Sequence, residues 1–190
     1  MKKNKGLIIA GVIVLVLVII AASVIGSYNS LVEAEESVAN YYADIQTQLQ
    51  RRADLIPNFV STVKGYSEYE QETLTAVTNA RAAVKSAATP EDAANADAQL
   101  DGAISVWVNA ITEAYPDLKA NQSYIALQDE LAGTENRIAQ ARIKYNEAAT
   151  GFNVSVRKFP TSILASIFNF EKVELFEAVA GSENVPSVEF

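Results

Sequence analysis

The hydrophobic and polar positions divide the chain into an apolar run followed by segments with helical periodicity. Residues 7–25 contain fourteen Leu, Ile or Val residues and no charged residue. At about 1.5 Å per residue, a helix of some twenty residues is roughly as long as the hydrocarbon core of a bilayer is thick. We therefore expect residues 6–26 to form a transmembrane anchor and to contact the lipid bilayer.

Two alternatives compete with an uncleaved anchor. A buried core helix is disfavoured because the run has no polar face. A cleaved signal peptide is supported by the basic residues Lys2, Lys3 and Lys5 and by the small residues at 21–23. However, the run is longer than the roughly 7–15 apolar residues of a signal peptide. We favour the anchor, preceded by a basic tail at 1–5.

Beyond the run, apolar residues recur at steps of three and four, which predicts amphipathic helices. The first covers 28–52 and continues directly from the anchor as one rod. We expect this rod to turn at 54–57, because proline is tolerated in the first turn of a helix and not in its interior. Asp54 would cap a second helix that runs to about residue 88, with a soft spot at Gly65.

Local signals mark the boundaries of the later helices. Thr89 is expected to cap a third helix that begins at Pro90 and ends before Pro116, because a residue preceding proline is pushed out of helical geometry. A fourth helix should start near 121–123. Its apolar stripe is the most regular and comprises Tyr124, Leu127, Leu131, Thr134, Ile138, Ala141, Tyr145, Ala148 and Phe152. A short capped helix is expected at 161–168, after which Phe170, Leu175 and Phe176 would fasten the tail.

These segments predict an all-α fold with no strand-like alternation. The N-terminal transmembrane helix continues into an up-down antiparallel bundle of four long helices, with a short C-terminal helix and an irregular tail. The expected divisions are a cytoplasmic tail at 1–5, the anchor at 6–26, the bundle at 27–168 and an acidic tail at 169–190.

The composition removes the commonest catalytic chemistries. The chain has no cysteine and no histidine, which excludes disulfides, a lipidated cysteine, thiolate nucleophiles, Ser-His-Asp triads and Glu-x-x-His di-iron sites. We predict no catalytic residue, no cofactor and no metal. A carboxylate metal site at Glu35, Glu70 and Glu130 is disfavoured because no aspartate-rich loop accompanies it.

The charge is distributed unevenly. Without the three N-terminal lysines the chain holds 12 basic and 23 acidic residues, a net charge of −11. Such a surface repels nucleic acid and anionic lipid headgroups, so neither is expected as a primary ligand. Lysines before the anchor and acidic residues after it favour a cytoplasmic N-terminus and a domain outside the membrane.

Two clusters of polar residues are candidate sites. The first lies around the expected corner between helices and comprises Arg51, Arg52, Asp54, Asn58 and Lys64. It is either a recognition site for an acidic partner or headgroup or, as we favour, charge complementarity at helix ends. The second lies along the fourth helix and comprises Glu130, Glu135, Asn136, Arg137, Arg142 and Asn146. There we expect ion pairs and a buried polar network that sets the helix register.

Several motifs together resemble the LemA family of bacterial membrane proteins. They occur in the family's order at residues 28–32, 48–58, 63–66, 115–120, 134–139, 141–146, 153 and 159–160. The resemblance covers almost the whole chain and implies a single membrane pass with a domain of long antiparallel helices. It implies no catalytic residue, because the family has no established biochemical function. Family members have been described with the N-terminus outside the cell, whereas the lysines here favour the reverse.

The sequence thus predicts location better than activity. Our main hypothesis is a non-enzymatic scaffold or interaction module at the bacterial inner membrane, which binds a protein partner or itself. One alternative is a carboxylate-dependent enzyme or enzyme accessory subunit, with Glu130 and Glu135 as the first residues to test. A second alternative is a homo-oligomeric assembly that shapes the membrane.

Overall fold

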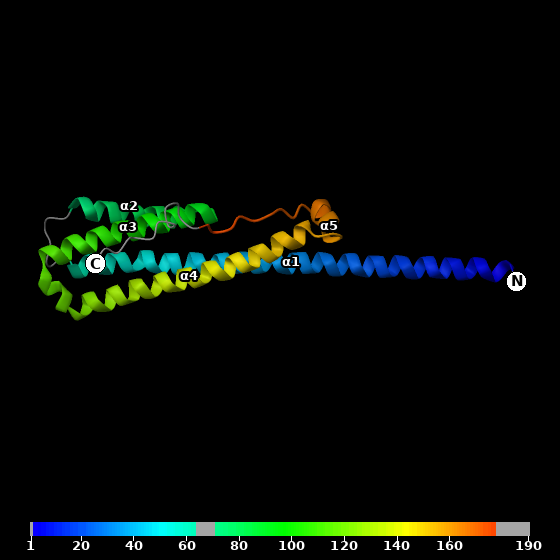
Figure 1. Cartoon of the computed structure of the whole chain (residues 1–190), viewed down its shortest axis with the longest axis horizontal. Coiled ribbons are helices and arrows are strands. Elements are labelled where there is room, and N and C mark those ends of the chain that lie inside the picture. Colours follow the sequence, from blue (N-terminus) through cyan, green and yellow to red (C-terminus); the bar gives the residue numbers. More distant parts are fainter. Residues whose placement is uncertain (1, 64–70, 178–190) are drawn as a thin grey trace, which may run out of the picture. The chain divides into compact units, whose positions relative to one another are not determined.

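The computed structural model describes residues 2–63 and 71–177, and their regular structure is entirely helical (Figure 1). In chain order the elements are α1 (Lys2–Val63), α2 (Gln71–Ser86), α3 (Pro90–Ala114), the 3₁₀ helix η1 (Pro116–Ala120), α4 (Gln122–Arg157) and α5 (Thr161–Phe168). Within the described ranges there are five α-helices and no strand, which confirms the predicted all-helical class.

The chain divides into two compact units. Unit 1 consists of Met1–Ala39 and Glu147–Val173, so it contains the apolar N-terminal part of α1, the end of α4, and α5. Unit 2 consists of Asn40–Asn146 and Glu174–Phe190, with α2, α3, η1 and the remaining parts of α1 and α4.

The predicted turn at 54–57 is wrong, because α1 is one helix that passes through Pro57. Proline has no N–H to donate to the carbonyl four residues earlier, here that of Ala53. That carbonyl instead accepts a 2.7 Å hydrogen bond from Nε of Arg81 on α2. Because a side chain from another helix replaces the missing donor, the helix accommodates its proline.

The predicted role of Asp54 as a helix cap is wrong for the same reason, since Asp54 lies within α1. The described part of α1 ends at Val63 and the next helix begins at Gln71. The expected soft spot at Gly65 lies outside the described residues.

The predicted boundaries of α3 and α4 are confirmed. The hydroxyl oxygen of Thr89 accepts a 3.1 Å hydrogen bond from the backbone N–H of Asp92, with Pro90 in the first turn. At the start of α4, the side-chain oxygen of Asn121 accepts hydrogen bonds from the N–H groups of Ser123 and Tyr124. Both caps supply acceptors to N–H groups that have no partner within the helix.

The core of unit 2 is built around large aromatic residues. The ring of Phe59 on α1 lies 5.1 Å from Trp107 on α3 and 5.3 Å from Tyr124 on α4, between centroids. The helices α2 and α3 lie side by side (Figure 1). Six of the nine residues of the predicted α4 stripe are buried across the two units, namely Tyr124, Leu131, Thr134, Ile138, Tyr145 and Phe152.

In unit 1 the apolar part of α1 is exposed along its whole length, from Gly6 to Gly26. The helix α5 has the predicted bounds, but Pro160 at its N-cap position makes no side-chain capping bond, so the expected cap is absent. Aromatic rings attach the following segment to the helices: Phe170 lies 5.9 Å from Tyr28 on α1 and 6.4 Å from Phe152 on α4.

Candidate functional site

A buried ionic network crosses unit 2 and joins three of its helices. We define the Asp97 network as Arg52 on α1, Asp97 and Asp101 on α3, and Glu135 and Arg142 on α4. One carboxylate oxygen of Asp97 accepts a 2.8 Å bond from Arg52, and the other accepts a 2.8 Å bond from Arg142. Arg52 also pairs with Asp101 and with Glu135, each at 2.6 Å. One guanidinium therefore links all three helices.

Burial makes this network costly to disturb. The side chains of Arg52 and Asp97 are only 3% and 4% exposed. Removing one partner of a buried ion pair leaves the other charge without compensation, which typically costs about 3–5 kcal/mol. The Nε atoms of Arg52 and Arg142 are buried without a partner among the described residues. The network joins α1, α3 and α4 through these paired charges, and its role in setting the helix register stays a prediction.

The electrostatics of Arg52 follow from its neighbours. Burial of the guanidinium acts to lower its pKa, whereas the surrounding carboxylates of Asp97, Glu135 and Asp101 act in the opposite direction. The carboxylates prevail, and the pKa of Arg52 is raised above its ordinary value. Arg52 thus stays charged, and its charge is used to hold helices together.

A more exposed chain of polar contacts joins α1 to α4. Glu130 accepts bonds from Arg51 at 2.8 Å and from Arg137 at 2.9 Å, and Arg137 also donates to Gln48. Since Arg51 is 59% exposed, these pairs are screened by water and contribute little to stability. Asn136 lies exposed on α4 and makes none of these contacts.

Asp54, placed by the sequence at the expected corner, instead connects α1 to α2. It accepts a 2.6 Å hydrogen bond from Gln50 and a 3.0 Å bond from Lys85, and these bonds lower the pKa of its carboxyl. Asn58 lies exposed on α1. Lys64 lies outside the described residues. The first predicted cluster is therefore not gathered at a corner, because no corner exists there.

Asn146 binds the tail rather than another helix. Its side-chain amide donates to the carbonyl of Phe176 at 2.8 Å and accepts from the N–H of Phe176 at 2.9 Å. The Phe176 ring packs 5.2 Å from Tyr145, and the guanidinium of Arg142 lies 5.4 Å above it. A pair of hydrogen bonds to one backbone residue imitates strand pairing, and it places Phe176 against α4.

In unit 1, the side-chain amide of Asn153 forms an equivalent pair of hydrogen bonds with Val173. It donates to the carbonyl of Val173 and accepts from its N–H, both at 2.9 Å.

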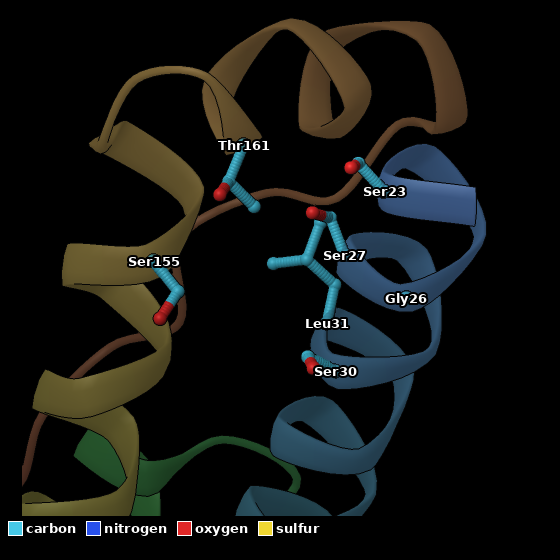
Figure 2. Close-up of a pocket in the computed structure, with 7 residues that line it drawn as sticks. All are labelled: Ser23, Gly26, Ser27, Ser30, Leu31, Ser155 and Thr161. Carbon is cyan, nitrogen blue, oxygen red and sulfur yellow. The ribbon is translucent and has the colours of Figure 1, made fainter. Parts of the chain in front are cut away.

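Unit 1 also contains a cavity of about 460 Å³ (Figure 2). It is lined by residues of α1, by one residue of α4 and by one of α5, namely Ser23, Gly26, Ser27, Ser30, Leu31, Ser155 and Thr161. The hydroxyls of Ser23 and Ser155 are each bonded to the backbone carbonyl four residues earlier. The lining is rich in hydroxyl groups and carries no charge.

The sequence was compared with models of known protein families. The LemA family model matches residues 41–190, which is most of the chain. The chain belongs to the LemA family. This confirms the resemblance found in the sequence, and the matched region includes every residue of the Asp97 network.

The relatives of this LemA-family chain carry two kinds of name, LemA and magnetosome protein MamQ. Protein LemA of Metamycoplasma hominis is 28% identical over 155 residues, which cover 81% of this chain and 70% of the relative. Magnetosome protein MamQ 2 of Paramagnetospirillum magneticum is 24% identical over 201 residues, covering 92% of this chain and 74% of the relative. Magnetosome protein MamQ of Magnetospirillum gryphiswaldense is 37% identical over a shorter stretch of 67 residues, 35% of this chain and 25% of the relative.

Sequence reasoning missed Asp97, the centre of the network. It falls on the apolar stripe of α3, between Ala93 and Leu100, at the usual steps of four and three. A charged residue at a position that the helical period assigns to the core is the signal that identifies such a network.

Proposed function

We propose that this protein is a non-enzymatic scaffold, held in the bacterial inner membrane by residues 6–26, that presents unit 2 to a protein partner or to a second copy. In this proposal the four helices of unit 2 form an up-down bundle. Membership of the LemA family and the relatives named MamQ support a membrane-associated role without assigning an activity.

The observation that carries the proposal is the contrast between charged and apolar side chains. The two carboxylates that are the first candidates for chemistry are engaged in ion pairs: Glu130 pairs with Arg51 and Arg137, and Glu135 pairs with Arg52. Meanwhile α1 contains a segment long and apolar enough to cross a membrane, with its side chains exposed. Carboxylates that are engaged in ion pairs within the protein support a structural role for the bundle, and the exposed apolar segment supports an anchor.

Orientation follows from charge in this proposal. Three lysines precede the apolar run and Glu33, Glu35 and Glu36 follow it, which favours a cytoplasmic N-terminus. A cysteine introduced at the exposed Gln140 is unique, because the chain has no cysteine of its own. Labelling of this cysteine by a membrane-impermeant reagent in intact cells, after outer-membrane permeabilisation where needed, supports the orientation. Labelling only after lysis contradicts it.

Photo-crosslinking in native membranes tests the scaffold directly. A crosslinking residue is placed at one of the exposed apolar positions of unit 2: Val106 on α3, or Ile125 or Ile143 on α4. We expect adducts with a partner protein or a second copy, identified by mass spectrometry. The matched control at Leu15, in the apolar run, should yield lipid adducts. If the three unit 2 positions capture no protein, this chain included, the scaffold proposal is wrong.

A further inference from the structure

Unit 1 exposes large apolar side chains in the turn between α4 and α5 and along α5. Phe159 is 75% exposed, Ile163 53%, Ile167 64% and Phe168 50%. Ile163 and Ile167 are four residues apart on α5 and so share one face of that helix. Four large exposed apolar side chains within ten residues of sequence are more than a water-soluble surface usually carries without a ligand or partner. We call these four residues the α5 patch.

Within unit 1, α5 lies beside the end of the apolar run of α1. Thr161, the first residue of α5, lines the same cavity as Ser23 and Ser27 of α1 (Figure 2). The ring of Phe168, at the other end of α5, lies 4.7 Å from the ring of Tyr28. Both ends of α5 thus lie beside residues 23–28 of α1, which are the last turns of the apolar run and the first residues after it.

In a transmembrane helix this level corresponds to the boundary between hydrocarbon and headgroups. The exposed side chains of Ile20, Val24 and Ile25 belong to the run itself, so the surface of the anchor continues toward the level of α5. The hydroxyl groups that line the cavity, and Tyr28 beside them, suit an interfacial layer that is partly wet. Exposed Arg157 and Lys158 directly precede Phe159, and such basic residues reach headgroup phosphates while their stems stay in apolar surroundings.

We infer that the α5 patch is a second membrane contact, in which α5 lies in the bilayer interface next to the anchor. The inference rests on the proposed anchoring through residues 6–26. The occupant is the interfacial layer of a phospholipid bilayer, because α5 lies beside the last turns of the run that would cross that bilayer. The net negative charge of the chain does not oppose this contact, since apolar burial carries it and the lipid can be zwitterionic.

Spin labels on the full chain test the inference in phosphatidylcholine nanodiscs. Since the chain has no cysteine, single cysteines can be introduced at Ile163, at Ile167, at Leu15 in the run and at exposed Gln140 on α4. Oxygen concentrates in the bilayer and a nickel chelate stays in water, so their relative collision rates report depth. We expect the oxygen-to-nickel ratio at Ile163 and Ile167 to be several-fold above that at Gln140 and below that at Leu15.

The outcomes separate this inference from the proposed function. A lipid-like ratio at Leu15 together with a water-like ratio at Ile163 and Ile167 overturns the interfacial contact and leaves the anchor in place. A water-like ratio at Leu15 overturns the anchor itself. Spin–spin broadening between labels at Ile167, without oxygen contact, assigns the patch to a second copy and also overturns the inference. The labelled positions are exposed, so the substitutions leave the core intact.

Discussion

Units 1 and 2 depart from the usual distribution of side chains in opposite directions. Unit 2 buries charge, with Arg52 and Asp97 almost inaccessible to solvent, although charged residues are rarely buried without pairing. Unit 1 instead exposes large apolar side chains along residues 6–26 and in the α5 patch. The first arrangement joins helices through paired charges, and the second is a surface that water solvates poorly.

The difference suggests that unit 2 determines the stability of the fold, whereas the exposed residues of unit 1 determine the surroundings of the protein. In unit 2 the specific interactions join α1, α3 and α4 through hydrogen-bonded charges, so a single substitution should affect the whole helical core. In unit 1 the exposed apolar residues have few contacts to lose, so substitution there should leave folding unchanged and alter only the surroundings that the unit prefers.

Asp97→Asn should destabilise unit 2 most. It removes the charge that two arginines share, and we expect the free energy of unfolding to fall by about 3–5 kcal/mol. The measurement is chemical denaturation of the full chain in mild detergent, followed by circular dichroism. The matched control is Asp101→Asn, which affects the same Arg52 from a carboxylate that is 61% exposed and should cost about 1 kcal/mol or less. Equal losses in the two variants would contradict the central role of Asp97.

Arg81→Met should cost about 1–3 kcal/mol, because it leaves the carbonyl of Ala53 without a donor. A double-mutant cycle shows whether Pro57 is the cause. In a Pro57→Ala background the helix supplies its own N–H to that carbonyl, so Arg81→Met should then cost clearly less. The same denaturation experiment gives the coupling. Additive effects would mean that Arg81 does not compensate for the proline.

Tyr145→Phe should reduce stability by about 0.5–1.5 kcal/mol, because the phenol donates a 2.7 Å hydrogen bond to the carbonyl of Glu174. Burial raises the pKa of Tyr145, so its protonated form is favoured in the folded state. This contribution is fully present below the unfolded pKa of about 10 and is lost as pH rises above it. The wild type should therefore lose more stability than Tyr145→Phe between neutral and alkaline pH. Parallel losses would argue against this assignment.

Ile163→Ser combined with Ile167→Ser should give the smallest change in stability, within about 0.5 kcal/mol of the wild type in detergent. Both residues are exposed in unit 1, so little packing is removed. The same double variant should lower the oxygen-to-nickel ratio of a label at Phe159 in nanodiscs. A large loss of unfolding free energy would show that the α5 patch is part of a core, and the comparison between the units would fail.

The parts of the fold that the sequence predicted are those governed by local chemistry. The start of α3 at Thr89 and Pro90 and its end before Pro116 depend on groups within a few residues of each boundary. The corner at 54–57 was predicted wrongly because the tolerance of α1 for Pro57 depends on Arg81, a residue 28 positions from Ala53. No local pattern encodes that partnership.

The candidate site shows the same limit. Sequence spacing identified Glu130, Arg137 and Arg142 as network residues on α4, because residues on one helix keep a known periodicity. It separated them from Arg52, which belongs to the other predicted cluster. Only the packing of α3 between these groups places Asp97 within reach of both arginines. The cavity of unit 1 likewise requires α1, α4 and α5 to meet.

Photo-crosslinking at Leu15 in unit 1 and at Ile143 in unit 2 tests the proposal of a membrane-anchored scaffold most directly. In native membranes, the adducts identify the molecules that surround each unit. We expect lipid adducts at Leu15 and protein adducts at Ile143. Two results would contradict a membrane-anchored scaffold. One is that no protein adduct forms at Ile143, Val106 or Ile125, and the other is that no lipid adduct forms at Leu15.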